Sequence, residues 1–279
     1  MVSLGVHHSY GFVGLGAMGY WASGSSTLSM AKNLRAKSSP TIKLYVYDIA
    51  STRADQLAAE SEPANGHIVK CMSVAEVVQN SDVIFTIVPE GKHVLQVFSQ
   101  TNNGALSVTD ISGKLFIDCS TIDVSTSQTV ARAVAERGAD FFDAPVSGGT
   151  VGALEGTITF MLGTSPDHPR HNEILPILQT MGNKVFACGA PTLGLAAKLC
   201  NNYISGNIAI ATAEGMNLGM KLGLNPKTLS DVVAVSTGGS WVNQSCNPVP
   251  GVVPKAPASN NYEPGFKVEL MLKDYNLAV

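Results

Sequence analysis

The sequence has little charge, and the two signs nearly balance. Lys and Arg number 18 and Asp and Glu number 21 among 279 residues, so the formal net charge is −3 at pH 7. Nucleic acids and anionic membrane surfaces are bound by concentrated Lys and Arg, and the sequence has no basic run. It also lacks the stretch of about 18 apolar residues that a spanning helix needs. We therefore expect neither nucleic acid nor a membrane as a partner.

Cysteine is scarce and scattered. The five cysteines are an odd number, and none belongs to a Cys-x-x-Cys pair. They are Cys71, Cys119, Cys188, Cys200 and Cys246. This pattern argues against a disulfide framework and favours a reducing compartment. His168 and His171 are three residues apart, but no acidic or cysteine partners accompany them, so we predict no metal site.

Short apolar runs and helical patterns alternate through the first half of the chain. Hydrophobic residues make up 45% of the sequence, enough for a sizeable core. The apolar runs cover residues 10–13, 42–47, 83–88, 115–117 and 140–142, each ending at a polar, Gly or Pro turn. Helical patterns such as residues 53–60 and 125–137 lie between them. Strand, crossover helix and strand in alternation predict a parallel sheet.

The sequence pattern changes between residues 187 and 192, from alternating strands and helices to a long helical pattern. Apolar residues at helical spacing fill residues 193–222 and predict one long helix or two abutting helices, and Gly223 and Pro226 mark the end of this pattern. A loop rich in Pro, Gly and Asn follows, and a last helix begins near Val268. We predict an α/β protein with an N-terminal Rossmann-type parallel-sheet domain over residues 1–190 and an all-α domain over residues 191–279.

A glycine-rich turn follows the first apolar run. In Gly14-x-Gly16-x-x-Gly19, the first glycine permits a tight turn, the second lets the backbone approach a pyrophosphate, and the third lets helix and strand pack closely. The free N–H groups of the following helix would face the phosphates. This context predicts a dinucleotide site; the alternative is a glycine turn without a ligand.

An acidic residue is expected about 20 residues after the glycine turn, where it binds the adenosine ribose. Asp48 ends the second apolar run but lies 29 residues after Gly19. Residues 21–28 have low helix propensity, and without them the spacing between Gly19 and Asp48 would be the usual one. We therefore predict an insertion that breaks the first helix. The Asp48 carboxylate favours NAD, because it would repel the extra phosphate of NADP; the alternative is a strand-end turn residue.

Several segments together resemble the β-hydroxyacid dehydrogenases. They are Gly11 to Gly19, Asp143-Ala-Pro-Val-Ser-Gly-Gly-Thr150, Gly194-x-x-x-Lys198-x-x-Asn201-Asn202, Asn247-Pro-Val-Pro-Gly251 with Asn260-Asn-Tyr262, and Phe266 with Leu270-x-x-Lys273-Asp274. The Asn-Pro-Val-Pro-Gly and Asn-Asn-Tyr segments look most like the 3-hydroxyisobutyrate dehydrogenases. The resemblance runs from Tyr10 to the end of the chain.

Lys198 is the candidate catalytic residue. It lies on an otherwise apolar helical pattern and shares a helix face with Gly194, Asn201 and Asn202. A lysine amine in a low-dielectric cleft exchanges its proton more readily than one in water. A solvated helix face is the alternative for a lone lysine. The resemblance places the family's catalytic lysine at Lys198.

Other site residues come from the resemblance and from local sequence. Ser147, Gly148 and Gly149 read as a short turn whose hydroxyl and N–H groups hold a substrate carboxylate, against the alternative of a plain turn. The resemblance implies that Asn202 orients the substrate and that Asp274 supports the closed cleft. It implies cofactor contacts for Gly14, Gly16, Met18, Gly19, Asp48, Val88, Pro89, His93, Ser120, Thr121 and Lys273.

The implied activity is NAD-dependent oxidation of 3-hydroxyisobutyrate to methylmalonate semialdehyde, a step of valine catabolism, by a homo-oligomer. One alternative is a related reductase that acts on tartronate semialdehyde. The resemblance implies a mitochondrial location. The residues before the first glycine motif contain no arginine, so no transit peptide is visible and a cytoplasmic location is the other expectation.

Two departures from the family pattern favour a further alternative, an inactive dinucleotide-binding variant. The insertion at residues 21–28 lies close to the predicted pyrophosphate site. Family members also continue further past the Lys-Asp pair, where this sequence has only residues 275–279. We expect the shorter end to expose apolar surface.

Overall fold

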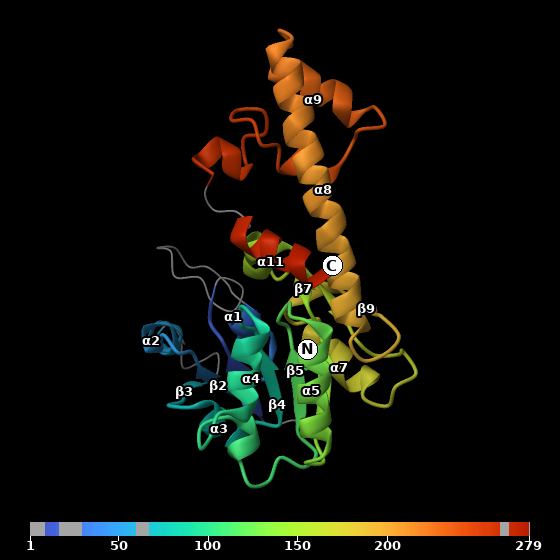
Figure 1. Ribbon diagram of the computed structural model, residues 1–279. Helices are drawn as coiled ribbons and strands as arrows, with labels where there is room; N and C mark the ends of the chain where they lie inside the picture. Colours follow the sequence, from blue (N-terminus) through green and yellow to red (C-terminus); the bar gives the residue numbers. More distant parts are fainter. Residues whose placement is uncertain (1–8, 17–29, 60–66, 263–267, 279) are drawn as a thin grey trace. The chain divides into compact units, whose positions relative to one another are not determined.

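The computed structural model describes residues 9–16, 30–59, 67–262 and 268–278, and it divides into two compact units, Met1–Lys198 and Leu199–Val279. Six parallel strands form the central sheet of unit 1 (Figure 1). They are β1 (Ser9–Val13), β2 (Lys43–Tyr47), β3 (Ile68–Lys70), β4 (Val83–Thr86), β5 (Leu115–Asp118) and β6 (Asp140–Asp143). Their order, β3-β2-β1-β4-β5-β6, confirms the predicted Rossmann-type sheet.

Helices cover both faces of this sheet, because each strand sends alternate apolar side chains to opposite sides. The crossover helices are α1 (Met30–Lys37), α2 (Ser51–Ala59), α3 (Val74–Gln79), α4 (Gly91–Ser99) and α5 (Val124–Ala135), with a short 3₁₀ turn at Ala105–Ser107. Phe12 and Phe85 join Leu34 of α1 in one hydrophobic cluster. Phe116 packs with α4 and α5 in the other cluster.

A second, three-stranded sheet follows β6 and was not predicted. It contains β7 (Val146–Ser147), β8 (Ile158–Leu162) and β9 (Gly182–Ala187), in the order β7-β8-β9. Helices α6 (Gly149–Glu155) and α7 (His171–Leu178) connect these strands. Apolar residues of β8 and α7 join the cluster that contains Phe12, so unit 1 has one continuous core on that side of the main sheet.

The long predicted helix is α8 (Leu193–Lys221), and it contains the division between the units, which falls after Lys198. Unit 2 continues with α9 (Pro226–Ala234), α10 (Trp241–Ser245), a 3₁₀ turn at Pro257–Asn260 and α11 (Val268–Ala278). These helices confirm the predicted helical C-terminal region. The predicted domain boundary between residues 190 and 191 stays a prediction.

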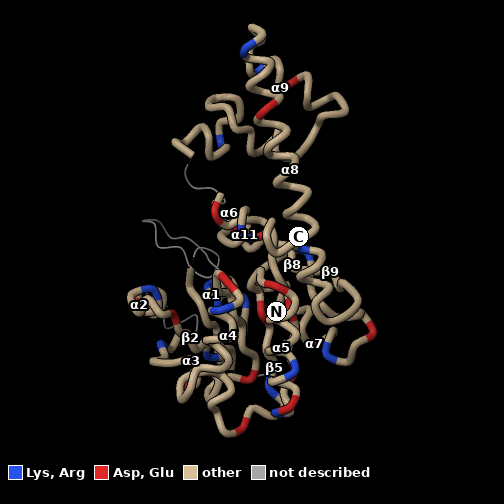
Figure 2. Tube along the Cα trace, viewed as in Figure 1, with Lys and Arg blue, Asp and Glu red and all other residues tan. Residues whose placement is uncertain are grey.

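Charge is sparse along α8, which is mostly tan in Figure 2. Its charged residues are Lys198, Glu214 and Lys221. None of the helices within the described ranges is long and apolar enough to cross a membrane. The predicted break in the first helix falls on residues 17–29 and lies outside the described residues; α1 begins after it, at Met30.

Candidate active site

The glycine turn lies where the strand order reverses, because β1 is flanked by β2 on one side and β4 on the other. Ligands of doubly wound sheets bind at the carboxyl ends of the strands at this point. Gly14 has φ +93°, and a Cβ there would lie 2.2 Å from the Ile87 carbonyl oxygen and 3.3 Å from Val88 Cγ1. Only glycine fits this position, and the turn is packed against the loop that follows β4.

Gly16 is less crowded than Gly14 among the residues that the structure describes. Of these residues, the nearest atom to a Cβ on Gly16 is Arg53 Nη1, at 3.9 Å. The described residues thus leave the backbone at Gly16 uncrowded, and the two glycines together fit a dinucleotide pyrophosphate. Met18 and Gly19, the other predicted residues of the turn, lie outside the described residues.

Asp48, which follows β2, holds the glycine turn in place. Its Oδ2 accepts a hydrogen bond from the Leu15 N–H at 2.5 Å, and its Oδ1 accepts one from the Ala50 N–H at 2.7 Å. Arg53 Nη1 lies 3.6 Å from Oδ1, an ion pair that the sequence did not indicate. A carboxylate has about four lone-pair sites, so Asp48 keeps the capacity to accept ribose hydroxyls.

The loops after β4 and β5 are tied together by a buried carboxylate. Ser120 Oγ accepts a hydrogen bond from the Val88 N–H at 2.9 Å and donates one to Asp118 Oδ1 at 2.6 Å. Thr86 Oγ1 donates to the same Asp118 oxygen at 2.7 Å. Burial raises the pKa of Asp118, and the hydrogen bonds from Ser120 and Thr86 oppose that shift. The Ser120 hydroxyl is therefore used in hydrogen bonds within the protein, and it holds the Val88 N–H in place.

Three further predicted cofactor residues lie in or near the same loops. Pro89 follows Val88, and Thr121 follows Ser120 in the loop after β5. His93 lies in the first turn of α4, where its Nδ1 is buried and accepts no hydrogen bond from the described residues. The contacts of these residues with a cofactor stay predictions.

Ser147, Gly148 and Gly149 do not form the simple turn that we expected. Ser147 ends β7 and pairs with Thr159 of β8, so its backbone belongs to a sheet. Gly148, with φ +131°, and Gly149, with φ +63°, then lead into α6. Among the described residues, a Cβ on Gly149 would have no atom within 4 Å. The half-buried Ser147 side chain remains a candidate for holding a carboxylate.

Lys198 lies on α8 at only 9% exposure, between the buried Leu195 and Leu199. The alternative of a solvated helix face is therefore wrong. The start of α8 is fixed by Asp143, at the end of β6, which accepts hydrogen bonds from the Thr192 N–H at 2.7 Å and the Leu195 N–H at 2.9 Å. No local pattern indicated this contact, because it joins residues far apart in the chain.

In unit 2, Asn202 is held by the last helix. Asn202 Nδ2 donates to Asp274 Oδ2 at 2.6 Å, and Asn202 Oδ1 accepts from Asn201 Nδ2 at 3.2 Å. Lys273 Nζ forms an ion pair with Asp274 Oδ1 at 3.0 Å. The structure thus brings together Asn202, Lys273 and Asp274, three predicted residues, through the contact of α11 with α8. Their roles toward substrate and cofactor stay predictions.

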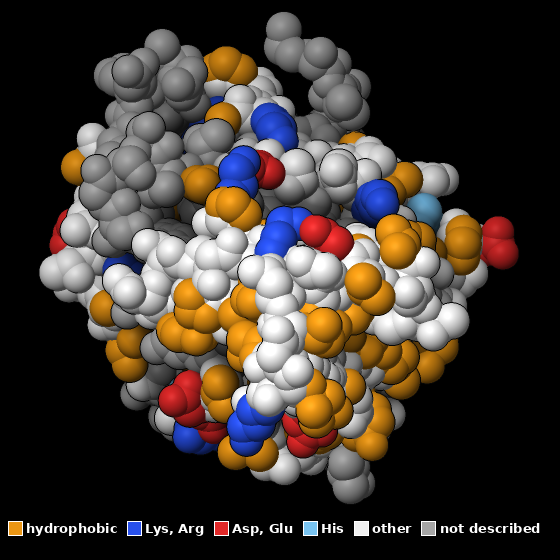
Figure 3. Space-filling model, turned by 90° about the horizontal axis from the view of Figure 1, so that it is seen from above, with side chains coloured by type: hydrophobic (Ala, Val, Ile, Leu, Met, Phe, Trp, Pro, Cys, Tyr) orange, Lys and Arg blue, Asp and Glu red, His pale blue; other side chains and the backbone are white. Residues whose placement is uncertain are grey.

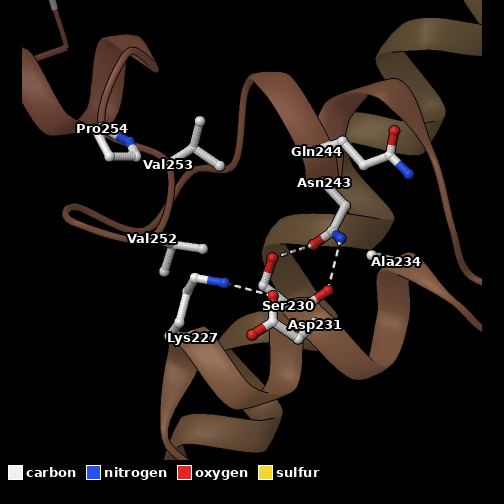
Figure 4. A pocket seen from close by; sticks show the side chains of 9 residues that line it. All are labelled: Lys227, Ser230, Asp231, Ala234, Asn243, Gln244, Val252, Val253 and Pro254. Carbon is white, nitrogen blue, oxygen red and sulfur yellow. Dashed lines mark hydrogen bonds and ion pairs between the residues drawn. The ribbon is translucent and has the colours of Figure 1, made fainter.

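A separate cavity of about 300 Å³ lies in unit 2 beside α9 and α10 (Figure 4). Its polar side chains bind one another: Lys227 pairs with Asp231 at 2.5 Å, and Ser230 Oγ donates to Asn243 Oδ1 at 3.2 Å. None of the predicted site residues that the structure describes lines this cavity. Within the described ranges, no group of three or more His, Cys, Asp or Glu residues is arranged to hold a metal ion.

Two family models match the chain. The NAD-binding domain of 6-phosphogluconate dehydrogenase matches residues 9–189. The NAD-binding domain of NADP-dependent 3-hydroxyisobutyrate dehydrogenase matches residues 193–279. The two matched segments together cover both the glycine turn and the helix that carries Lys198.

Similar proteins agree with these matches. The Mus musculus protein named mitochondrial 3-hydroxyisobutyrate dehydrogenase is 40% identical over 96% of this chain and 74% of its own length. The NAD-dependent L-serine dehydrogenase of Pseudomonas aeruginosa is 36% identical over 96% of this chain and 83% of its own length.

A solved structure supports the same relationship. The 3-hydroxyisobutyrate dehydrogenase of Mycobacterium tuberculosis, described with L-serine, has a TM-score of 0.81 and 35% identity, covering 97% of this chain and 85% of its own. The fold, the glycine turn and these similarities agree. The chain belongs to the β-hydroxyacid dehydrogenase family, is similar to its 3-hydroxyisobutyrate dehydrogenases, and is an oxidoreductase that uses NAD.

Proposed function

We propose that the chain oxidises 3-hydroxyisobutyrate to methylmalonate semialdehyde with NAD, and that Lys198 accepts the hydroxyl proton. The observation that carries the proposal is the burial of Lys198, at 9% exposure, on a helix whose start is bonded to the end of β6. Of the three charged residues of α8, Lys198 is buried whereas Glu214 and Lys221 are exposed. The proposal is supported by the 40% identity to the mouse enzyme of that name.

The residues of the chain would divide the work of the reaction. Bound NAD supplies the acceptor for the hydride that leaves the hydroxymethyl carbon. Lys198 Nζ, as the neutral amine, would take the hydroxyl proton, so that the products are the aldehyde, NADH and a lysine ammonium. Ser147 and the backbone of Gly148 and Gly149 would hold the substrate carboxylate, and Asn202 would orient the substrate.

The cofactor residues would fix the nucleotide against this site. Gly14 and Gly16 would admit the pyrophosphate, and Asp48 would accept the adenosine ribose hydroxyls. Val88, Pro89, His93, Thr121 and Lys273 are proposed to contact the cofactor. The hydrogen bond from the Val88 N–H to Ser120 and the buried one from Ser120 to Asp118 would keep the loop after β4 from shifting when NAD binds.

L-Serine is a second candidate substrate, favoured by the similarity to a serine dehydrogenase. Both compounds carry a hydroxymethyl group on the carbon next to a carboxylate. They differ at that carbon, where 3-hydroxyisobutyrate has a methyl group and serine an ammonium. The same proton acceptor and carboxylate site would serve both, so specificity depends on what faces this substituent.

NADH formation with a panel of substrates tests the proposal. The panel contains both enantiomers of 3-hydroxyisobutyrate and L-serine, with tartronate semialdehyde and NADH for the reverse direction. We expect the highest kcat/KM for (S)-3-hydroxyisobutyrate. A higher kcat/KM for serine or tartronate semialdehyde would replace the proposed substrate. No turnover of any panel member, together with normal NAD binding, would support the inactive dinucleotide-binding alternative.

The cellular role is proposed from the same similarities. The mammalian relatives are named as mitochondrial enzymes, so we propose a mitochondrial location and a step of valine catabolism. Localisation of the tagged protein in cells of its source tests this, and a purely cytoplasmic signal would contradict it.

A further inference from the structure

We propose that Asp143 is a positioning residue, whose carboxylate fixes the start of α8 against the end of β6 and thereby places the Lys198 amine for proton transfer. The inference rests on the proposed role of Lys198. It goes beyond that role by naming the group that sets the position of the lysine.

Asp143 bonds the first turn of α8 from outside the helix. Its two oxygens accept separate hydrogen bonds, Oδ1 from the Thr192 N–H at 2.7 Å and Oδ2 from the Leu195 N–H at 2.9 Å. These N–H groups have no partner within the helix, because the first turn of a helix leaves its donors unused. A two-point contact fixes both the position and the direction of the helix start.

Two glycines leave room for this carboxylate. A Cβ on Gly163 would lie 1.9 Å from Asp143 Oδ1. A Cβ on Gly194 would lie 2.8 Å from Asp143 Oδ2 and 2.1 Å from the Met161 carbonyl oxygen. Asp143 itself is only 2% exposed. A side chain at either glycine would collide with the carboxylate, so the residues after β8 and the start of α8 pack closely around Asp143.

The same residue also leads directly to the proposed carboxylate-binding segment. Ser147 follows four residues after Asp143, and the backbone between them is bonded to its neighbours: Ala144 N–H donates to the Asp118 carbonyl at 2.8 Å, and Met161 N–H to the Pro145 carbonyl at 3.0 Å. Lys198 follows three residues after Leu195, about one helical turn. Asp143 thus connects the segment proposed to hold the substrate with the helix that carries the proposed base.

A charge on Asp143 matters as well as its shape. A carboxylate interacts favourably with the positive end of a helix dipole. Burial raises the pKa of Asp143, while the N–H groups of Leu195 and Thr192 act to lower it. The pKa of the half-buried Cys188 thiol is raised mainly by burial and, to a smaller extent, by the negative charge of Asp143. The reactivity of Cys188 therefore depends on that charge.

The test compares Asp143→Asn with Asp140→Asn in the full chain. Both substitutions change a carboxylate to an amide in β6, but the Asp140 side chain is 43% exposed and pairs with Arg170 at the surface. An amide at position 143 accepts from one N–H and turns its NH₂ group toward the other. We expect Asp143→Asn to lower kcat by about 10- to 100-fold, the effect of a displacement of about 1 Å, with the Kd for NAD within about twofold of the wild-type value.

Two further measurements do not depend on turnover. Hydrogen exchange of the peptide over residues 192–198 should quicken in Asp143→Asn and not in Asp140→Asn. Alkylation of Cys188, in a background with the other cysteines changed to serine, should be faster in Asp143→Asn, because the thiol pKa falls. These two measurements test the contact between Asp143 and α8 without any turnover. If the wild-type protein turns over none of the panel substrates, the proposed function fails, and the two measurements still decide whether Asp143 fixes the start of α8.

Several results would overturn the inference. One is unchanged exchange over residues 192–198 in Asp143→Asn. Another is an active wild-type enzyme whose kcat is unchanged by the substitution, or a loss that appears in KM for NAD alone. If Asp143→Asn does not fold, Asp143→Ser retains one acceptor and is measured in the same way. Failure of both to fold while Asp140→Asn folds would show that Asp143 holds the whole unit together and does not specifically place Lys198.

Discussion

Asp118 is a buried carboxylate with three donors on one oxygen. Thr86 Oγ1, Ser120 Oγ and Ser120 N–H all donate to Asp118 Oδ1. Because the accepting atom is a single oxygen, an asparagine carbonyl in the same place accepts the same three bonds. Asp118→Asn therefore removes the charge and keeps the three hydrogen bonds, so it measures the effect of burying that charge.

We predict that Asp118→Asn becomes more stable relative to the wild type as the pH rises. Burial raises the Asp118 pKa above its ordinary value of 3.8 in the folded state. From that value upward the unfolded chain ionises first, so the wild type loses stability until the pH passes the raised folded pKa. The measurement is the free energy of urea unfolding of both proteins from about pH 4 to pH 7. A difference that is independent of pH, or that grows in the opposite direction, would refute this.

The single residues that the sequence could predict are those with a local signature. Gly14 and Gly16 stand in a recognisable turn after a strand, and Lys198 is a lone cation on an apolar helical pattern. Asp118 has no such signature, and Asp143 appeared only as the first residue of a family segment, with no role assigned to it. Their roles arise from contacts with residues that are distant in sequence, which only the folded chain brings together.

At the scale of elements, the two glycines of the turn after β1 make a matched pair. Gly14→Ala places a methyl group against the Ile87 carbonyl at positive φ, whereas among the described residues the nearest atom to a methyl group at position 16 is Arg53 Nη1, at 3.9 Å. We predict that Gly14→Ala lowers the free energy of unfolding by about 1–3 kcal/mol. Gly16→Ala should keep its stability within about 0.5 kcal/mol and weaken NAD binding about tenfold, or about 1.4 kcal/mol.

Thermal unfolding and calorimetric titration with NAD check this pair. Equal loss of stability in both variants would contradict the packing of Gly14 against the loop after β4. Unchanged NAD affinity in Gly16→Ala would show that the pyrophosphate does not approach the backbone at Gly16.

The elements themselves were predictable to different degrees. Five strands of the main sheet and α8 have regular apolar patterns and were predicted close to their observed bounds. The three-residue β3 was not predicted, because it is too short to show a pattern. The second sheet was missed because β7 has two residues and β9 exposes much of its length. Its strands form because β8 pairs with both neighbours, which no local pattern shows.

For the whole molecule, exposed large apolar side chains are most frequent in unit 2 among the described residues. Figure 3 shows hydrophobic side chains gathered on the face seen from above. The exposed residues of unit 2 include Leu218 at 60% exposure and Leu222 at 75%, on or just after α8, and Val235 at 89% after α9. Large exposed apolar surface marks interaction sites. The homo-oligomer that the family resemblance implied stays a prediction.

We predict that the purified protein is a dimer or larger assembly of its 29.2 kDa chain. Light scattering after gel filtration gives the mass. Leu218→Glu should reduce the mass or make it concentration-dependent, because it places a charge in the apolar surface. Met72→Glu is the control, since Met72 is 77% exposed in unit 1. A wild-type monomer at all concentrations would contradict the prediction.

The most direct test of the account is the activity of Lys198→Ala beside Lys221→Ala, the same change on the same helix at an exposed position. With (S)-3-hydroxyisobutyrate and NAD, we predict that Lys198→Ala lowers kcat by about 10²- to 10⁴-fold. Its Kd for NAD and its unfolding should match the wild type, and Lys221→Ala should keep wild-type kcat. A Lys198→Ala enzyme that keeps the wild-type kcat would contradict the assignment of Lys198 as the proton acceptor.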